Sequence, residues 1–188
     1  EGGYVFEPLP ISLTNNNAVG DVRYTLNGNI PNVNDLVFED QINISNTSVV
    51  NAKSFSNNFI SSYSNSHLYI LDESYTLPVL AILGDPVSFW SDSSGIYTNY
   101  LNEGVLWERR SNVQYFSEDS LFFSNYSGVR IQGRSSRNRA KKSFRLFYKN
   151  SYAQERLVYP LFSTEGTTSF KNLVLRSGYD DDIQMSTG

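Results

Sequence analysis

Short stretches of alternating apolar and polar residues recur along the first 76 residues, with Asn, Gly and Ser between them. In DVRYTLNG, Tyr24 and Leu26 share one side of an extended chain, and Asn27-Gly28 favours the positive φ angles of a tight hairpin. LVFEDQINIS repeats the pattern with Ile42 and Ile44, and TSVVNAKSF and HLYIL follow at regular spacing. This spacing predicts an antiparallel β-sandwich with Tyr24 and Leu26 turned inward.

Three features of the composition limit the kinds of site that the chain can form. The chain has no Cys, which excludes a disulfide framework, a Cys zinc site and a Cys nucleophile. The one histidine, His67, lies in a polar run without partner ligands, so we expect an ordinary surface histidine and no His-based triad or metal site. No stretch approaches the ~20 apolar residues that a membrane helix needs, so we expect no transmembrane segment.

Charge divides the chain into two parts. Residues 1–76 carry two basic and eight acidic residues, whereas residues 77–188 carry thirteen basic and eleven acidic ones. The second part opens with LPVLAILGDP, a continuous apolar run that predicts a strand buried on both faces. In FRLFY, Phe144, Leu146 and Tyr148 can face a core while Arg145 faces away. We therefore expect a mainly β protein with domains at 1–76 and 77–188.

The densest basic region is 128–149, where eight Lys and Arg occur without an acid. Gly128 and Gly133 allow the backbone to bend close to a ligand, and backbone N–H groups with fixed positive charge suit phosphate. The alternative is a solvated basic hairpin. Nucleic acid is a further alternative, which the net charge of −4 opposes, so we expect no nucleic-acid partner.

Two other features offer weaker sites. Trp90 lies in the polar loop FWSDSSG, where its ring could stack on a sugar, while Trp107 is expected to pack. Asp180, Asp181 and Asp182 could hold a metal ion, but neighbouring carboxylates diverge and the spacing of a calcium loop is absent. We expect a surface acidic cluster and no metal site.

Residues 20–55 resemble the C-terminal domain of chitobiases and β-hexosaminidases. The matching features are Arg23-Tyr24-Thr25-Leu26-Asn27-Gly28, the following Pro31 and the run ending in Ala-Lys-Ser-Phe. Asn27 stands where the family usually has Asp, and Gln41 where it often has Pro. The resemblance implies a small immunoglobulin- or fibronectin-like sandwich at 1–76.

Residues 77–183 resemble the N-terminal part of the CotH (spore-coat protein H) kinase family. The matching pieces, in order, are LPVLAILGDP, SSGIYTN, WERRSNVQYF, GVRIQGRSSRNRAKKSFRLFY, LVYPLF and SFKNLVLRSGYDD. The resemblance implies an ATP-dependent kinase-like fold using Mg²⁺ or Mn²⁺, whose phosphate-covering hairpin holds Gly133, Arg134 and Ser135. It places the phosphate-pairing lysine at Lys141 or Lys142, only one of which can point into a cleft.

Two functions follow from these expectations. The first is a piece of a secreted or cell-surface bacterial CotH-type kinase that lacks the catalytic acids, so that the piece alone is inactive. The second is a non-catalytic surface module for adhesion or carbohydrate association. Both predict extracellular proteins or polysaccharide as partners.

Overall fold

The computed structural model describes residues 2–15, 20–56, 62–162 and 165–178. The protein is mainly β, as the sequence predicts, and divides into two compact units. Unit 1 comprises Glu1–Asp85 and Asn112–Ser124, and unit 2 comprises Pro86–Ser111 and Asn125–Gly188. The boundary falls within strands β9 (Arg109–Ser117) and β10 (Ser120–Gln132), so both strands contribute residues to each unit.

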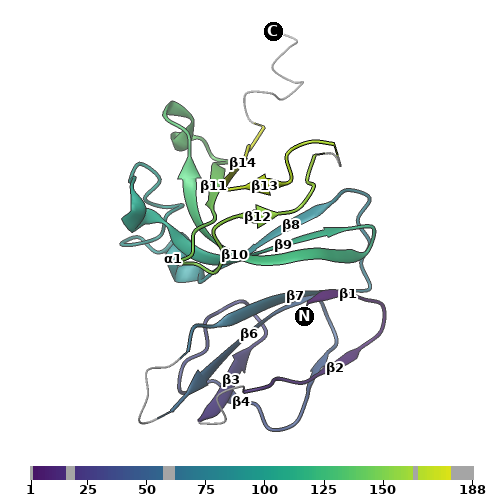
Figure 1. The fold of residues 1–188 in the computed structure, drawn as a ribbon. Coiled ribbons are helices and arrows are strands. Elements are labelled where there is room, and N and C mark those ends of the chain that lie inside the picture. Colours follow the sequence, from purple (N-terminus) through teal and green to yellow (C-terminus); the bar gives the residue numbers. More distant parts are fainter. Residues whose placement is uncertain (1, 16–19, 57–61, 163–164, 179–188) are drawn as a thin grey trace. The chain divides into compact units, whose positions relative to one another are not determined.

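Unit 1 contains a five-stranded sheet in the order β1-β7-β6-β3-β4 and a small sheet of β2 and β5 (Figure 1). The bounds are β1 Gly3–Val5, β2 Leu9–Ile11, β3 Asp21–Thr25, β4 Leu36–Val37, β5 Ile42–Ile44, β6 Ser48–Phe55 and β7 Asn65–Leu71. Strands β1 and β7 are parallel, and the other pairs are antiparallel.

The core of unit 1 lies between these two sheets. Ile42 and Ile44 from β5 pack with Val50 from β6 and Tyr69 from β7, and all four side chains are buried. Alternation along β5 leaves Asn43 exposed between the two isoleucines. The expected sandwich and the inward position of Ile42 and Ile44 are confirmed.

Two details of the expected first hairpin are wrong. Leu26 is 37% exposed, while Tyr24 is partly buried beside the core. Gly28 does have a positive φ of 84°, but β3 pairs with β4 only from Leu36, across a long connection. Side-chain hydrogen bonds fold this connection locally: Thr25 Oγ1 donates to Asn29 O at 2.5 Å, and Asn51 Nδ2 donates to Gly28 O at 2.7 Å.

The second sheet has the strand order β14-β11-β10-β9-β8. Its remaining strands are β8 (Val79–Leu83), β11 (Ser143–Phe147) and β14 (Asn172–Leu175), and β12 (Leu157–Val158) pairs with β13 (Ser169–Phe170). The described helices are short: α1 (Pro86–Trp90) and the 3₁₀ turns η1 (Val105–Trp107) and η2 (Ser135–Asn138). Strand β8 forms as expected, but it lies at the sheet edge and only Leu83 is buried. The expectation that this strand is buried on both faces is therefore wrong.

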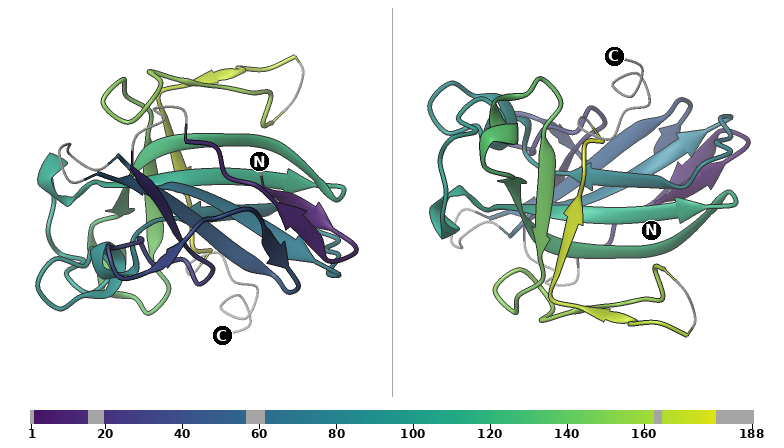
Figure 2. Two further views of the ribbon diagram at one scale, coloured as in Figure 1. Left: turned by 90° about the horizontal axis from the view of Figure 1, so that it is seen from below. Right: turned by 90° about the horizontal axis from the view of Figure 1, so that it is seen from above.

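Strands β10, β11 and β14 form the part of this sheet that carries the basic region. Figure 2 shows β11 (green) and β14 (yellow) side by side, paired from Phe144↔Leu175 to Phe147↔Asn172. Leu146 and Tyr148 are 0% and 2% exposed, which confirms the alternation expected for FRLFY. One face of these strands thus packs inward, and the other presents polar and basic side chains.

Candidate functional site

The basic region folds as a β-hairpin, with β10 paired to β11 from Gly128↔Phe147 to Gln132↔Ser143. Its turn contains η2, and Gly133 opens the turn with a φ of 120°. This angle favours glycine, and a Cβ atom there would also lie 2.3 Å from Ser136 Oγ, so the serine hydroxyl would have to turn away. The expectation that Gly133 lets the backbone bend at this position is therefore confirmed.

Gly128 has a different role from the one expected. It lies inside β10, away from the hairpin turn, and a Cβ there would meet the Tyr152 ring at 2.4 Å. The glycine lets an aromatic ring rest directly on the strand. The expectation that Gly128 brings the backbone close to a ligand is wrong, because Tyr152 occupies that space.

A pocket of about 210 Å³ lies beside the hairpin turn. It is lined by Gln132, Gly133, Ser136, Ser143, Val174, Arg176, Ser177 and Gly178. Ser143 Oγ accepts a hydrogen bond from Ser177 N at 3.0 Å, which fixes the end of β14 to the start of β11. Three serine hydroxyls, a glycine backbone and a guanidinium side chain suit an oxyanion.

Of the expected phosphate-binding residues, Gly133 alone lines this pocket. Arg134, Ser135 and Lys141 are exposed on the adjacent turn. These three side chains belong to the surface around the pocket, where their charge or hydroxyl is open to solvent.

Lys142 is held inside the protein. Its side chain is buried, its Nζ donates to Arg139 O at 2.7 Å, and it lies 5.0 Å from the Tyr97 ring centroid and 4.2 Å from that of Tyr100. Burial lowers the pKa of this amine below its ordinary value. Of the two lysines, Lys141 is exposed and Lys142 is buried, and neither lines the pocket beside Gly133.

Arg137 is a structural residue that sequence reasoning missed. Only 6% of it is exposed, and its guanidinium donates hydrogen bonds to four backbone carbonyls. The acceptors are Gly133 O (2.7 Å), Tyr100 O (2.9 Å), Asn102 O (3.0 Å) and Ile131 O (2.9 Å). The turn is thereby tied to the segment at 100–102. Nothing in the sequence SSRNR distinguishes this arginine from its neighbours.

A buried carboxylate, also missed, lies at the other end of the hairpin. The Glu108 side chain is 3% exposed and accepts hydrogen bonds from Lys149 Nζ (2.8 and 3.0 Å) and Tyr152 Oη (2.8 Å). Arg130 Nη1 is 3.8 Å away. Burial, followed by the hydrogen bond and the negative charge of Glu108, raises the pKa of Tyr152 to about 12. The one sequence feature that could have indicated this carboxylate is that Glu108 is the single acid in the segment LWERRS.

The two tryptophans differ in exposure. Trp90 is 58% exposed and its ring lies 4.6 Å from that of Tyr97, measured between centroids. Tyr97 is fixed because its Oη donates to Ala140 O at 2.8 Å. Trp107 is partly buried, with the Arg109 guanidinium 5.3 Å from its ring centroid.

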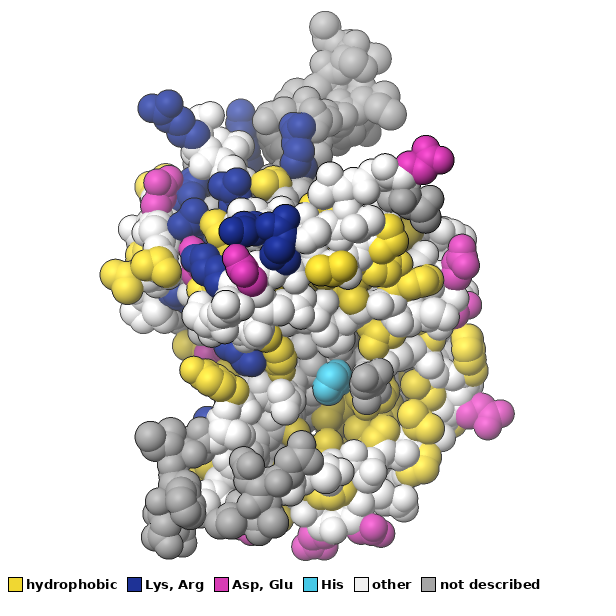
Figure 3. Space-filling view, viewed as in Figure 1, with side chains coloured by type: hydrophobic (Ala, Val, Ile, Leu, Met, Phe, Trp, Pro, Cys, Tyr) yellow, Lys and Arg dark blue, Asp and Glu magenta, His cyan; other side chains and the backbone are white. Residues whose placement is uncertain are grey.

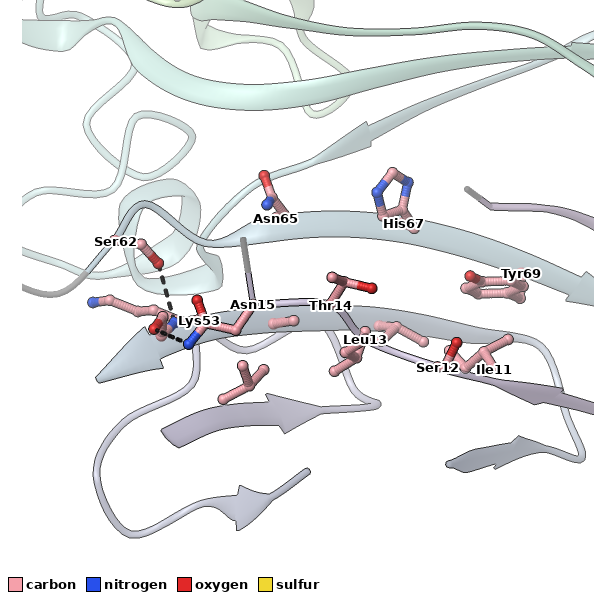
Figure 4. A pocket seen from close by; sticks show the side chains of 14 residues that line it. Ile11, Ser12, Leu13, Thr14, Asn15, Lys53, Ser62, Asn65, His67 and Tyr69 are labelled. Carbon is pink, nitrogen blue, oxygen red and sulfur yellow. Dashed lines mark hydrogen bonds between the residues drawn. The ribbon is translucent and has the colours of Figure 1, made fainter. Parts of the chain in front are cut away.

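Unit 1 has a separate cavity of about 320 Å³, shown in Figure 4. It lies between the segment Ile11–Asn15 and the strands β6 and β7, and His67 and Tyr69 are among its lining residues. His67 is partly buried, with Nδ1 3.2 Å from Gln114 Nε2. His67 still reaches the surface, as Figure 3 shows, but it is a partly buried side chain that contacts Gln114 of β9.

Among the described residues, no group of three His, Cys, Asp or Glu side chains could hold a metal ion. Asp180, Asp181 and Asp182 lie outside the described residues. None of the helices in the described ranges is long and apolar enough to cross a membrane.

Comparison with known proteins gives one family. Residues 1–66 match the family model of the chitobiase/beta-hexosaminidase C-terminal domain. No curated protein and no solved structure matches the chain. The matched range ends before residues 77–183, so it gives no support to the expected CotH resemblance. The sandwich of unit 1 is thus similar to the chitobiase/beta-hexosaminidase C-terminal domain, as its RYTLNG motif predicts.

Proposed function

We propose that unit 2 supplies a phosphate-binding hairpin to a CotH-type kinase, which works outside the cell or on its surface. The pocket beside Gly133 carries this proposal, because it joins serine hydroxyls, a glycine backbone and Arg176 at one end of a basic hairpin. The resemblance of residues 77–183 to the CotH family implies the same role for this turn. Exposed Arg134 and Lys141 add positive charge around the pocket.

The size of the pocket limits what it can hold. Its volume of about 210 Å³ is below the ~300 Å³ at which pockets for drug-sized ligands begin. It therefore accommodates phosphate groups, while the nucleoside of ATP would lie outside it. In the complete kinase, Mg²⁺ or Mn²⁺ would accompany ATP by binding its phosphate oxygens.

Exposed charges hold anions weakly. Ion pairs of exposed side chains contribute only about 0–1 kcal/mol each and are screened by salt. We expect a dissociation constant on the order of 1 mM for pyrophosphate at low salt, which corresponds to about 4 kcal/mol. Binding should weaken as the salt concentration rises.

The test is a titration of pyrophosphate and of labelled ATP against the wild-type protein and an Arg134→Ala/Lys141→Ala double variant. We expect a several-fold weaker affinity in the double variant at low salt and a smaller difference at high salt. Lys171→Ala is the matched control, because Lys171 is exposed and pairs with Glu155 at 3.3 Å. Equal binding by the double variant and the wild type would contradict the proposal.

A second function, carbohydrate association, is favoured by Trp90. Its exposed ring is supported from one side by Tyr97 and can offer the other side to a sugar. Trp90→Ala should abolish retention on insoluble polysaccharides such as chitin or cellulose. Trp107→Phe should leave retention unchanged, since Trp107 is partly buried. Retention by Trp90→Ala at the wild-type level would exclude this role of Trp90.

A further inference from the structure

Two arginines lie directly opposite each other on neighbouring strands of unit 2. Arg130 in β10 pairs with Arg145 in β11, so their side chains project from the same face of the sheet. Like charges in this arrangement destabilise a sheet. Their juxtaposition therefore needs a compensating interaction.

An aromatic ring lies among these charges. The ring centroid of Phe147 is 4.7 Å from the guanidinium carbon of Arg130, 5.6 Å from that of Arg145 and 5.0 Å from Lys149 Nζ. We call these four residues the arginine face. In Figure 3, Lys and Arg side chains gather over the region where Figure 1 shows β11 and β14.

The positive charges of the arginine face are only partly compensated by acidic residues. Glu108 binds Lys149 at 2.8 Å and lies 3.8 Å from Arg130. Arg145 makes no ion pair or hydrogen bond with any residue in the described ranges. The Nε atoms of Arg130 and Arg145 are both inaccessible to solvent and without a hydrogen-bond partner there. The terminal Nη groups of Arg145 are not among the buried unsatisfied atoms of the described residues, so an anionic ligand would meet Arg145 there and supply the negative charge that it lacks.

We propose that the arginine face binds an acidic saccharide, a sugar ring that carries a carboxylate. A guanidinium presents parallel N–H donors that match the two oxygens of a carboxylate. The partly buried Phe147 ring provides apolar surface for the C–H groups of the sugar. The net charge of −4 disfavours a long polyanion such as nucleic acid, whereas a few carboxylates on a sugar match the three cations of the arginine face. This inference does not depend on the nucleotide proposal, because the arginine face and the pocket at Gly133 share no residue.

The experiment is isothermal titration of trigalacturonate into the whole protein. We expect saturable binding, a roughly tenfold loss of affinity in Arg145→Gln, and a loss of about threefold in Phe147→Leu. These fold-changes correspond to about 1.4 and 0.6 kcal/mol. Lys171→Gln serves as the control and should bind like the wild type. Thermal melting verifies that each variant folds, and Arg145→Lys replaces Arg145→Gln if that variant does not.

Three comparisons complete the test. Galactotriose has the sugar rings without the charge, and citrate has three carboxylates without the rings; both should bind at least tenfold more weakly than trigalacturonate. Pyrophosphate binding should be the same in Arg145→Gln and in the wild type, which separates this site from the pocket at Gly133. Equal trigalacturonate affinity in Arg145→Gln and wild type would overturn the proposal. Citrate binding as tight as trigalacturonate, or tighter binding of single-stranded DNA, would also overturn it.

Discussion

Replacing Arg137 with methionine removes a guanidinium that holds three backbone segments of unit 2 together. Methionine fills a similar volume, so the perturbation acts mainly on the hydrogen bonds. The lost bonds run to the carbonyl oxygens of Gly133, Tyr100, Asn102 and Ile131 at 2.7–3.0 Å. Each carbonyl must then find water or remain unsatisfied.

The magnitude follows from charge and burial. A hydrogen bond from a charged group contributes about 1.5–3 kcal/mol, but carbonyls near the surface can be rehydrated after the change. Four such bonds are lost together, but bonds from one group do not add fully, so the total is about 3–5 kcal/mol. We expect Arg137→Met to lower the free energy of unfolding by about 3–5 kcal/mol, a large part of the ~5–15 kcal/mol of a typical domain.

Urea denaturation followed by tryptophan fluorescence measures this loss. Trp90 and Trp107 both belong to unit 2, so the signal reports the unit that contains Arg137. Glu103→Gln is the matched control: its carboxylate is 3.4 Å from Arg137 but 69% exposed, so it should cost at most about 1 kcal/mol. A loss below about 1 kcal/mol in Arg137→Met, or a loss equal to that of Glu103→Gln, would refute the reasoning.

Three further predictions concern the same hairpin. Gly128→Ala should lower the free energy of unfolding by about 1–3 kcal/mol, because its Cβ would meet the Tyr152 ring at 2.4 Å; a double-mutant cycle with Tyr152→Ala should recover part of the loss. The folded-state pKa of Tyr152, about 12, exceeds the ordinary value of about 10. The protonated phenol of Tyr152 therefore contributes fully to the free energy of unfolding below pH ~10, and this contribution is lost as the pH rises towards ~12. Urea denaturation at several pH values should show that the free energy of unfolding falls less over this range in Tyr152→Phe than in the wild type. Lys142→Met should leave pyrophosphate binding unchanged in a titration in which Lys141→Ala weakens it, since Lys142 is buried and Lys141 is exposed.

The sequence predicts the strands well, because alternation is a local signal. Ile42 and Ile44, or Leu146 and Tyr148, face inward in the way that a period of two requires. The alternation gives the wrong result at Leu26, which was expected to face inward next to a tight hairpin turn but is exposed. Instead, side-chain hydrogen bonds such as that from Asn51 to Gly28 O fold the connection, and they join residues far apart in the chain.

The site is predicted less completely, for the same physical reason. Gly133 carries a local backbone signal, which the structure explains through its φ angle and Ser136. Arg137 and Lys142 belong to a run of similar basic residues, and their burial depends on Tyr100, which lies more than thirty residues earlier. No pattern within the run distinguishes a buried cation from an exposed one.

The enclosure of Lys142 has a consequence for chemical labelling. Its lowered pKa leaves more of the amine uncharged and nucleophilic at a given pH than in an exposed lysine. We expect the rings of Tyr97 and Tyr100 to hinder acylation of Lys142, and the exposed Lys141 to react faster. Mass spectrometry of the acylated chain can therefore use Lys141 as an internal reference. Modification of Lys142 then reports how often the segment that carries the two tyrosines opens.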